Sequence, residues 1–209
     1  MQQATSPVRV QFHFDPLCPL AWRTALWMRE VRNVRPVEVT WRFFSLEVVN
    51  RKEGVTPDYA KDGSWAAERT LVMARREGGN DALERLYLAL GAAQHGRGES
   101  MKEVDVIRAA LKKAELDEGL VARALEDETT IEEVLADHQE AVRRYRAFGV
   151  PTIALDGAYV GFYGPIIQDV PRGENAGEHW DYLSWALRQP NLFELKRDRR
   201  SGVWGPVAE

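Results

Sequence analysis

The sequence predicts an α/β protein, in which a small mixed sheet with flanking helices is divided by a long helical segment. Three stretches of the chain carry this prediction. Residues 8–43 have the spacing of a strand, a helix and a second strand. Residues 57–148 have helical spacing throughout, with breaks at glycines and capping residues. Residues 149–163 return to strand character, with a proline, a β-branched run and a hairpin signal.

The first stretch opens with alternating apolar and polar residues over 8–14, which predicts a strand. Apolar spacing of three to four residues then predicts a helix that fades near Val31 to Asn33. A second alternating run over 37–43 predicts another strand. A β-helix-β opening of this kind implies a parallel pair with a right-handed crossover. Residues 44–57 lose any period and predict a loop.

The helical stretch is divided at Gly78-Gly79, and the glycine-rich residues 91–99 predict a helix end and a loop. Thr130 with Glu133 resembles a capping box, so a long helix is expected from there to Gly149. The chain therefore leaves the sheet after its second strand and returns to it only after this helix.

The return to the sheet begins with Pro151, which stands directly before a β-branched run. A proline is tolerated at the first residue of a strand or at a sheet edge. Asp156-Gly157 is a strong turn signal and predicts a hairpin that pairs residues 152–155 with 159–163.

The turn between the first strand and the first helix carries the only cysteine of the chain, Cys18, followed by Pro19. Proline suits the first helical position. The free N–H groups and the dipole at a helix start favour an anion, so a thiol there is expected to lose its proton more readily, although Asp15 opposes this. The alternative is that Cys18 is a small buried hydrophobe. The turn by itself leaves both interpretations open.

These motifs resemble the thioredoxin superfamily, whose redox members carry Cys-x-x-Cys at the start of the first helix. The run Phe14–Pro19 together with Trp22 is similar, more specifically, to the DsbA-like branch that contains the actinobacterial mycothiol-dependent nitroreductases. The resemblance extends from about residue 8 to residue 197. This sequence departs from the branch at Leu20, where an aromatic residue is usual, and at Ala21, where the second cysteine is usual. Without that cysteine the protein cannot close the internal disulfide.

The resemblance implies a thioredoxin-like fold with a large all-helical insertion, the architecture of DsbA and of the kappa-class glutathione transferases. Residues 8–48 and 130–197 are expected to form the thioredoxin-like domain, residues 49–129 the insertion and residues 198–209 a C-terminal tail. The active site is expected where the insertion meets the two halves of the thioredoxin-like domain.

The resemblance also implies the site residues. Cys18 is the expected catalytic residue, and in this family the proline at position 151 is cis and packs against it; a trans proline that opens a strand is the alternative. The expected supporting residues are Pro19, Trp22, Val150, Pro151 and Thr152, and the residues that match the thiol pocket of the branch are Asn50, Tyr59 and His95. A loop asparagine is usually only a turn former. His13 is interpreted as a polar strand position and His138 as a satisfied core histidine.

Composition limits the classes of function. Of 209 residues, 44% are hydrophobic and 29% charged, as in soluble globular proteins. A net charge of −4 gives no basic footprint, so nucleic acid is not an expected partner. A single cysteine excludes a disulfide framework, and the four histidines have no metal-ligand spacing, so no metal is expected. The sequence has no membrane-spanning run and no signal-peptide core near its start, so a cytoplasmic location with no membrane partner is expected.

The leading hypothesis is a cytoplasmic, DsbA-like thiol-disulfide oxidoreductase that uses Cys18 alone, with a small thiol or disulfide as substrate. A low-molecular-weight thiol (mycothiol, bacillithiol or glutathione) would be the resolving partner, and no tightly bound cofactor is expected. Two alternatives stay open: a kappa-class-like thiol transferase or isomerase, in which Cys18 orients a bound thiolate, and a catalytically silent thioredoxin-fold binding protein. The sequence does not indicate an oligomeric state.

Overall fold

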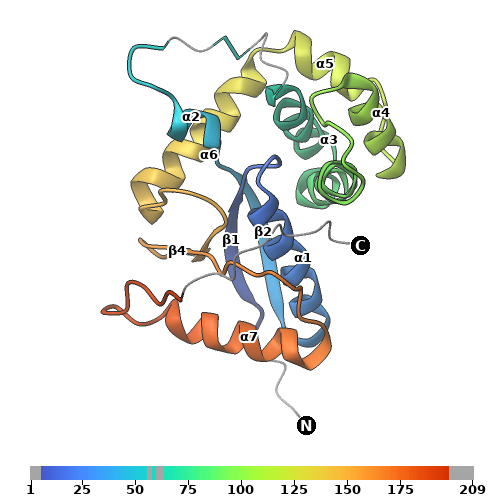
Figure 1. The fold of residues 1–209 in the computed structure, drawn as a ribbon. Helices are drawn as coiled ribbons and strands as arrows, with labels where there is room; N and C mark the ends of the chain where they lie inside the picture. Colours follow the sequence, from blue (N-terminus) through green and yellow to red (C-terminus); the bar gives the residue numbers. More distant parts are fainter. Residues whose placement is uncertain (1–5, 56–57, 60–63, 198–209) are drawn as a thin grey trace.

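The computed structural model describes residues 6–55, 58–59 and 64–197. Its described residues form one four-stranded sheet with helices on both sides and a helical group at one end (Figure 1). The expected tail, residues 198–209, lies outside the described residues.

The sheet has the strand order β2-β1-β3-β4. Strands β1 (Val8–Phe14) and β2 (Val37–Phe43) are parallel and pair over their full length, from Val8 with Val37 to Phe14 with Phe43. Strand β3 (Thr152–Leu155) is antiparallel to β1, with His13 opposite Thr152. The mixed sheet and the parallel β-helix-β opening are as predicted.

The hairpin is shorter than predicted, because β4 comprises only Phe162–Tyr163 rather than residues 159–163. The turn itself closes as expected, with the Ala158 amide donating to the Leu155 carbonyl at 3.0 Å. Beyond it, the Gly161 amide donates to the Tyr145 carbonyl at the end of α6 and not to β3. Because the Gly161 amide is bonded to α6, it does not pair with β3, and β4 begins only at Phe162.

Three helices flank the sheet. Helix α1 (Pro19–Val34) connects the parallel strands, and α7 (Gly173–Ala186) packs beside it, with Trp27 Nε1 donating to the Ala176 carbonyl at 3.1 Å. Helix α6 (Thr129–Tyr145) lies on the other side of the sheet from α1 (Figure 1). The sequence predicted that α6 would run to Gly149, but it ends at Tyr145 because Arg146 takes a left-handed conformation, with φ +56°.

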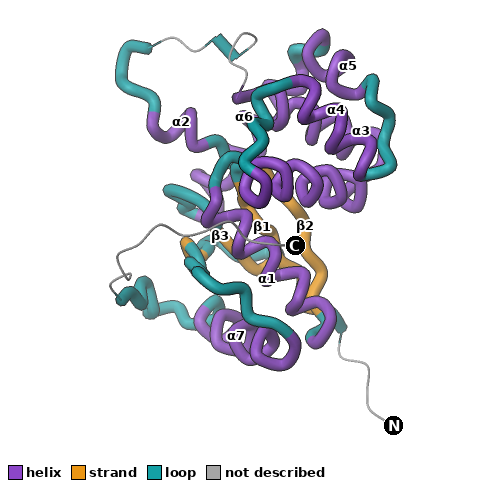
Figure 2. The backbone as a smooth tube through the Cα atoms, turned by 45° about the vertical axis from the view of Figure 1, so that its right-hand side comes forward, coloured by secondary structure: helices purple, strands orange, loops and turns teal. Residues whose placement is uncertain are grey.

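Between β2 and α6, the described elements are all helices, joined by loops: α2 (Leu46–Asn50), α3 (Ser64–Gly91), the π-helix η1 (Ala92–Arg97), α4 (Val104–Lys113) and α5 (Leu120–Glu126). Helices α3, α4 and α5 gather at one end of the sheet, while α7 lies at the other (Figure 2). Two predicted loops are wrong in part. Residues 44–57 contain the short helix α2, and residues 91–99 contain η1. The predicted break at Gly78-Gly79 is confirmed, since both residues leave helical geometry.

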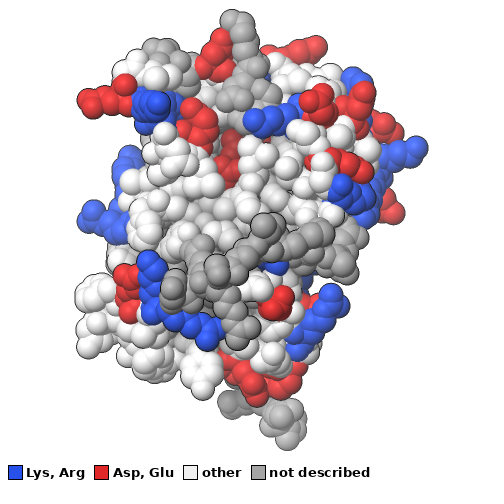
Figure 3. All heavy atoms as spheres, viewed as in Figure 1, with Lys and Arg blue, Asp and Glu red and all other residues white. Residues whose placement is uncertain are grey.

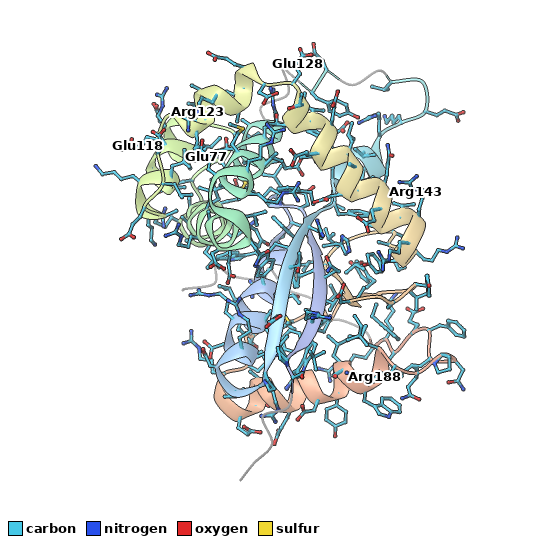
Figure 4. The ribbon with its side chains drawn as sticks, turned by 180° about the vertical axis from the view of Figure 1, so that it is seen from behind. Glu77, Glu118, Arg123, Glu128, Arg143 and Arg188 are labelled. Atoms are coloured by element: carbon cyan, nitrogen blue, oxygen red, sulfur yellow. The ribbon has the colours of Figure 1, made fainter. Side chains whose placement is uncertain are left out.

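Ion pairs tie the helical group together and to α6. Arg75 on α3 bonds Glu133 at 2.8 Å and the buried Asp137 at 2.5 Å, both on α6. Arg123 on α5 bonds Glu77 on α3 at 2.7 Å, and Figure 4 shows these two side chains together between their helices. The Arg123 pair is about half exposed, so solvent screens it and it adds little to stability. The pair with Asp137 is mostly shielded from water and holds α3 more firmly.

The two faces of the sheet differ in chemistry. Phe12, Phe14 and Trp41 are fully buried on the face toward α3, with ring centroids 4.8 Å apart for Phe12 and Trp41. The opposite face, under α6, carries His13 and Arg42. His13 is buried, which corrects its interpretation as an ordinary polar strand position.

Neither ring nitrogen of His13 has a hydrogen-bond partner within the described part of the chain. His138 on α6 is also buried, and its Nδ1 is unpartnered, so it is not the satisfied core histidine that the sequence suggested. Burial lowers the pKa of His13 to about 3, with smaller contributions from Arg42 and His138. The ring packs on Tyr145, 5.2 Å between centroids.

We expect His13 to make the protein less stable in acid. Between pH 6.5 and about 3, the unfolded chain binds a proton on this imidazole that the folded chain excludes. The contribution to stability is therefore complete above pH 6.5 and is lost as the pH falls. When the pH is lowered from 8 to 5, the unfolding free energy of the wild type should fall by about 2 kcal/mol more than that of His13→Phe. Urea unfolding at the two pH values measures this.

The matched control is His179→Phe, because His179 is exposed on α7. This variant should keep the wild-type pH dependence. A His13→Phe protein that loses as much stability as the wild type on acidification would contradict the prediction.

Candidate functional site

Cys18 is the N-cap of α1, with extended backbone angles (φ −81°, ψ 111°), and Pro19 opens the helix as the sequence predicted. The Cys18 sulfur accepts a hydrogen bond from the Ala21 amide at 3.5 Å. The side chain is buried, with 5% of its surface exposed, whereas Pro19 is exposed and Leu20 is half-buried.

The loop that precedes β3 meets Cys18 from the other half of the chain. The Val150–Pro151 peptide bond is cis. The Cys18 thiol donates to the Val150 carbonyl at 3.7 Å, across 132 positions of sequence. Val150, Pro151 and Thr152 are all buried, and the Thr152 hydroxyl donates to the Gly149 carbonyl at 2.7 Å, which fixes the turn.

The Asp15 carboxyl group holds the Cys18 turn in place through hydrogen bonds to two backbone amides. One oxygen accepts the Leu17 amide at 2.8 Å and the other accepts the Leu46 amide of α2 at 2.7 Å. The Cys18 amide donates to the Asp15 carbonyl at 3.0 Å. Burial raises the pKa of Asp15, and the two backbone donors oppose that effect. One buried carboxyl group therefore binds both the Cys18 turn and the start of α2.

The expectation of an acidic Cys18 thiol is wrong in direction. Burial raises the pKa of Cys18, and this outweighs the lowering by the Ala21 and Leu20 amides at the helix start. The charge of Asp15 raises the pKa of the thiol further, as the sequence suggested. The resting site thus holds a protonated thiol, for which the Val150 carbonyl is a suitable acceptor.

Aromatic side chains form the base of the site. Trp22, one helical turn after Cys18, is buried, and its ring lies edge-on to Tyr87 of α3 at 5.7 Å. Tyr87 also packs on Phe14 at 4.2 Å. Gly91 lies against the Trp22 ring so closely that an added Cβ would stand 2.2 Å from a ring carbon. The absence of a side chain at Gly91 is what lets α3 reach α1 here.

His95 reaches the site from the π-helix η1. Its Nε2 lies 2.9 Å from the Pro16 carbonyl, and its ring stacks on Trp22 at 6.1 Å. Burial lowers the pKa of His95, as does the charge of Arg23, while the Pro16 bond raises it. π-Helices are often found at functional sites.

The other two expected pocket residues lie on α2 and in the segment after it. Tyr59 is half-buried, accepts a bond from Arg51 at 2.6 Å and packs on Trp65 at 4.2 Å. Asn50 is exposed at the last residue of α2. His95 therefore contacts the Cys18 turn directly, whereas Tyr59 contacts Arg51 and Trp65.

Tyr87 and Gly91 were not among the residues expected from sequence. Tyr87 shares a helix face with Leu83, Leu86 and Leu90, which predicts only burial. Gly91 had the pattern of a helix end. No sequence signal showed that these two residues would meet the first helix. For Asp15 the sequence indicates only a charge near the thiol, because its hydrogen bond to the Leu46 amide depends on the fold.

The described residues hold no group of three or more His, Cys, Asp or Glu side chains that could bind a metal ion. Within the same part of the chain, no helix is long and apolar enough to cross a membrane. On the face shown in Figure 3, basic and acidic side chains lie beside one another around an uncharged area. The absence of a nucleic-acid partner stays a prediction.

The fold and the Cys18–Pro151 arrangement define a thioredoxin-fold protein of the DsbA type with a helical insertion. The model of the mycothiol-dependent nitroreductase Rv2466c family matches residues 17–197. The chain belongs to this Rv2466c-like family. It is also 36% identical over 192 residues to the uncharacterized protein Rv2286c of Mycobacterium tuberculosis, covering 91% of this chain and 82% of that protein.

Solved structures share the fold at low sequence identity. A 2-hydroxychromene-2-carboxylate isomerase superposes with a TM-score of 0.62 and 18% identity, covering 86% of this chain and 94% of that one. A probable DsbA oxidoreductase from Streptomyces coelicolor superposes with a TM-score of 0.58 and 22% identity, covering 97% and 99%. These neighbours confirm the thioredoxin-like fold class.

The contact between Gly91 and Trp22 gives a test of how the site is assembled. Gly91→Ala would force a methyl group into the indole, and neither partner has free space. Overpacking of this kind costs about 1–3 kcal/mol or more. We expect the variant to unfold at lower urea concentration and to lose the contact of His95 with the Cys18 turn.

The control is Gly119→Ala at the start of α5, where an added Cβ meets only the ends of the Arg123 and Asp117 side chains, both at 3.2 Å. Those side chains can move aside, so this variant should stay close to the wild type. If Gly91→Ala and Gly119→Ala unfold at the same urea concentration, a methyl group at position 91 does not strain the contact with Trp22, and the prediction is wrong.

Proposed function

We propose that the protein is a cytoplasmic thiol-disulfide oxidoreductase that works through Cys18 alone, with a low-molecular-weight thiol as the resolving partner. The observation that supports this most directly is the 3.7 Å contact of the Cys18 sulfur with the Val150 carbonyl, beside Pro151. The mycothiol-dependent description of the matched family favours mycothiol as that thiol, with bacillithiol or glutathione as the equivalents.

In the proposed reaction, the Cys18 thiolate attacks one sulfur of a disulfide. The S–S bond of the substrate breaks, one half leaves as a thiolate, and a mixed disulfide forms on Cys18. A second small thiolate then attacks the mixed disulfide, forms a new small disulfide and returns Cys18 to the thiolate. Electrons move only between sulfurs, and no further oxidant is needed.

The roles of the remaining residues follow from their positions. Pro19 opens α1 and Trp22 forms the base of the site, while Val150, Pro151 and Thr152 form the loop along which the substrate sulfur would approach. His95 would contact the bound thiol from η1. Asn50 and Tyr59 would contact its outer part from α2 and the segment after it.

The test is the intact mass of the protein after exposure to an oxidised small thiol, with Cys18→Ser as control. One adduct should form on the wild type, and the reduced thiol should remove it. Because burial raises the pKa of Cys18, adduct formation should accelerate as the pH rises above neutrality. An adduct on Cys18→Ser, or full thiol-dependent activity of that variant, would overturn the proposal.

A second function is favoured by one observation, that the site stabilises the protonated thiol. In a transferase or isomerase, Cys18 would orient the thiolate of a bound thiol without forming a bond to it. The structural likeness to the isomerase extends to the fold only. Turnover of a substrate with no protein adduct, while Cys18 stays open to small alkylating agents, would favour this alternative.

A second prediction concerns Ala21, whose backbone nitrogen lies 3.5 Å from the Cys18 sulfur. Ala21→Cys would supply an internal resolving thiol one helical turn away. We expect an internal disulfide to form and the mixed disulfide no longer to accumulate. Mass spectrometry with and without alkylation separates the two products.

Ala25→Cys is the matched control, since Ala25 is also fully buried on α1. Seven residues along the helix, its thiol lies about 10 Å from Cys18, too far for a disulfide. A mixed disulfide that persists in Ala21→Cys as it does in Ala25→Cys would contradict the resolving role of that position.

A further inference from the structure

Helix α7 has an outer face that the described chain leaves largely uncovered. Its inner face is buried through Ala176, Gly177 and Trp180. On the opposite face, Tyr182 is 78% exposed and Trp185 is 57% exposed. Figures 1 and 2 both place α7 at an outer edge of the molecule, away from the helical group. Exposed aromatic side chains that lie side by side are typical of interaction surfaces.

The two aromatic side chains belong to a stripe along the helix. We call it the α7 stripe, and it consists of Glu178, Tyr182, Trp185 and Gln189. Spacings of four, three and four residues place these side chains on the same side of a helix. The helical turn continues past the last residue of α7, because the Arg188 amide donates to the Trp185 carbonyl at 3.0 Å.

The α7 stripe has opposite charges at its two ends. Glu178 lies toward its start and Arg188 at its end, where Figure 4 labels it, and both are exposed. Two other acids of this helix, Glu174 and Asp181, already bond Arg35 at 2.6 and 2.8 Å. Glu178 forms no ion pair with any described residue. The order along the stripe is therefore acid, two aromatic rings, base.

This order makes the α7 stripe complementary to a second copy of itself. In a contact with two-fold symmetry, the same patch is used on both subunits. When two α7 helices pack antiparallel about an axis between Tyr182 and Trp185, each tyrosine meets the tryptophan of the other copy. Glu178 of each copy then meets Arg188 of the other, so the charge pair forms twice. Parallel packing would instead place Glu178 against Glu178.

We propose that α7 is a homodimer interface, in which two copies of the chain pack through Tyr182 and Trp185 and pair Glu178 with Arg188. The interface is separate from the cysteine chemistry. Helix α7 bonds α1 at Trp27 and at Arg35, and Arg35 lies about 25 Å along α1 from the Cys18 turn. Each copy therefore keeps its own Cys18 turn outside the contact.

The size of the surface predicts a reversible dimer. Phe193 is 84% exposed and comes directly after a turn closed by the Leu192 amide and the Gln189 carbonyl at 3.5 Å. Aromatic side chains bury about 150–250 Å² each, so the exposed parts of Tyr182, Trp185 and Phe193 supply on the order of 400 Å² per copy. A standard interface takes about 800 Å² from each partner. With the charged residues as its rim, the contact lies at the small end of this range, and the dimer should dissociate on dilution.

The experiment is sedimentation velocity of the full chain across a wide range of protein concentration. The wild type should pass from monomer to dimer as the concentration rises. Glu178→Arg and Arg188→Glu each place like charges at both ends of the contact, so each should weaken association about tenfold or more. The double variant Glu178→Arg/Arg188→Glu restores opposite charges and should dimerise as the wild type does.

Two control variants test whether the effects belong to this face. Glu118→Arg makes the same charge change at an exposed position between α4 and α5, which Figure 4 labels, and should leave association unchanged. Tyr182→Ser should weaken association, whereas Tyr159→Ser, which removes a tyrosine that is 79% exposed in the hairpin, should not.

A wild type that stays monomeric at every concentration would overturn the inference. So would a double variant that associates as weakly as the single variants, because the charge pair would then not form across the contact. The single variants should form the Cys18 adduct at the wild-type rate, so the dimer and the proposed function are tested independently.

Discussion

The arrangement of the site depends on one buried carboxyl group. Asp15 follows β1, and its two oxygens bind the amides of Leu17 and Leu46. A carboxyl group removed from water must keep such partners, because an unpaired one costs several kcal/mol. These bonds hold the Cys18 turn and the start of α2 at fixed distances from the end of β1. The position of Cys18 against Val150 therefore depends on a residue whose side-chain hydrogen bonds go to backbone amides and not to the sulfur.

The helical group packs against the Cys18 turn and the first turn of α1. Gly91 lets α3 approach Trp22, and the wider turns of η1 then carry His95 to the Pro16 carbonyl. Tyr87 packs against the last residue of β1 in the same layer. The first turn of α1 thus contacts the Val150 loop through the Cys18 sulfur and the end of α3 through the Trp22 ring.

Much of this could be predicted from sequence, and the reasons are local. Alternation in β1 and β2 and the Cys18-Pro19 turn depend on neighbours in the chain, so the fold class followed from them and from the resemblance. The direction of the thiol pKa shift could not be predicted, because the Cys18 turn left a reactive thiol and a buried thiol both open. The partners of Tyr87 and the unpaired nitrogens of His13 depend on contacts between distant elements. The early end of α6 comes from Arg146, which takes the left-handed conformation that the sequence analysis assigned to a glycine end at Gly149.

Under the proposed function, burial of Cys18 has a chemical consequence for selectivity. In a dithiol site the resolving sulfur comes from inside the protein, but here Ala21 contributes only a methyl group. The mixed disulfide must then wait for an external thiolate, and only 5% of the Cys18 surface is exposed to bulk solvent. A thiol that merely collides with the protein meets a shielded sulfur, whereas one that binds along the Val150 loop gains both proximity and orientation. The same burial that raises the thiol pKa would therefore restrict release to a thiol that the site recognises.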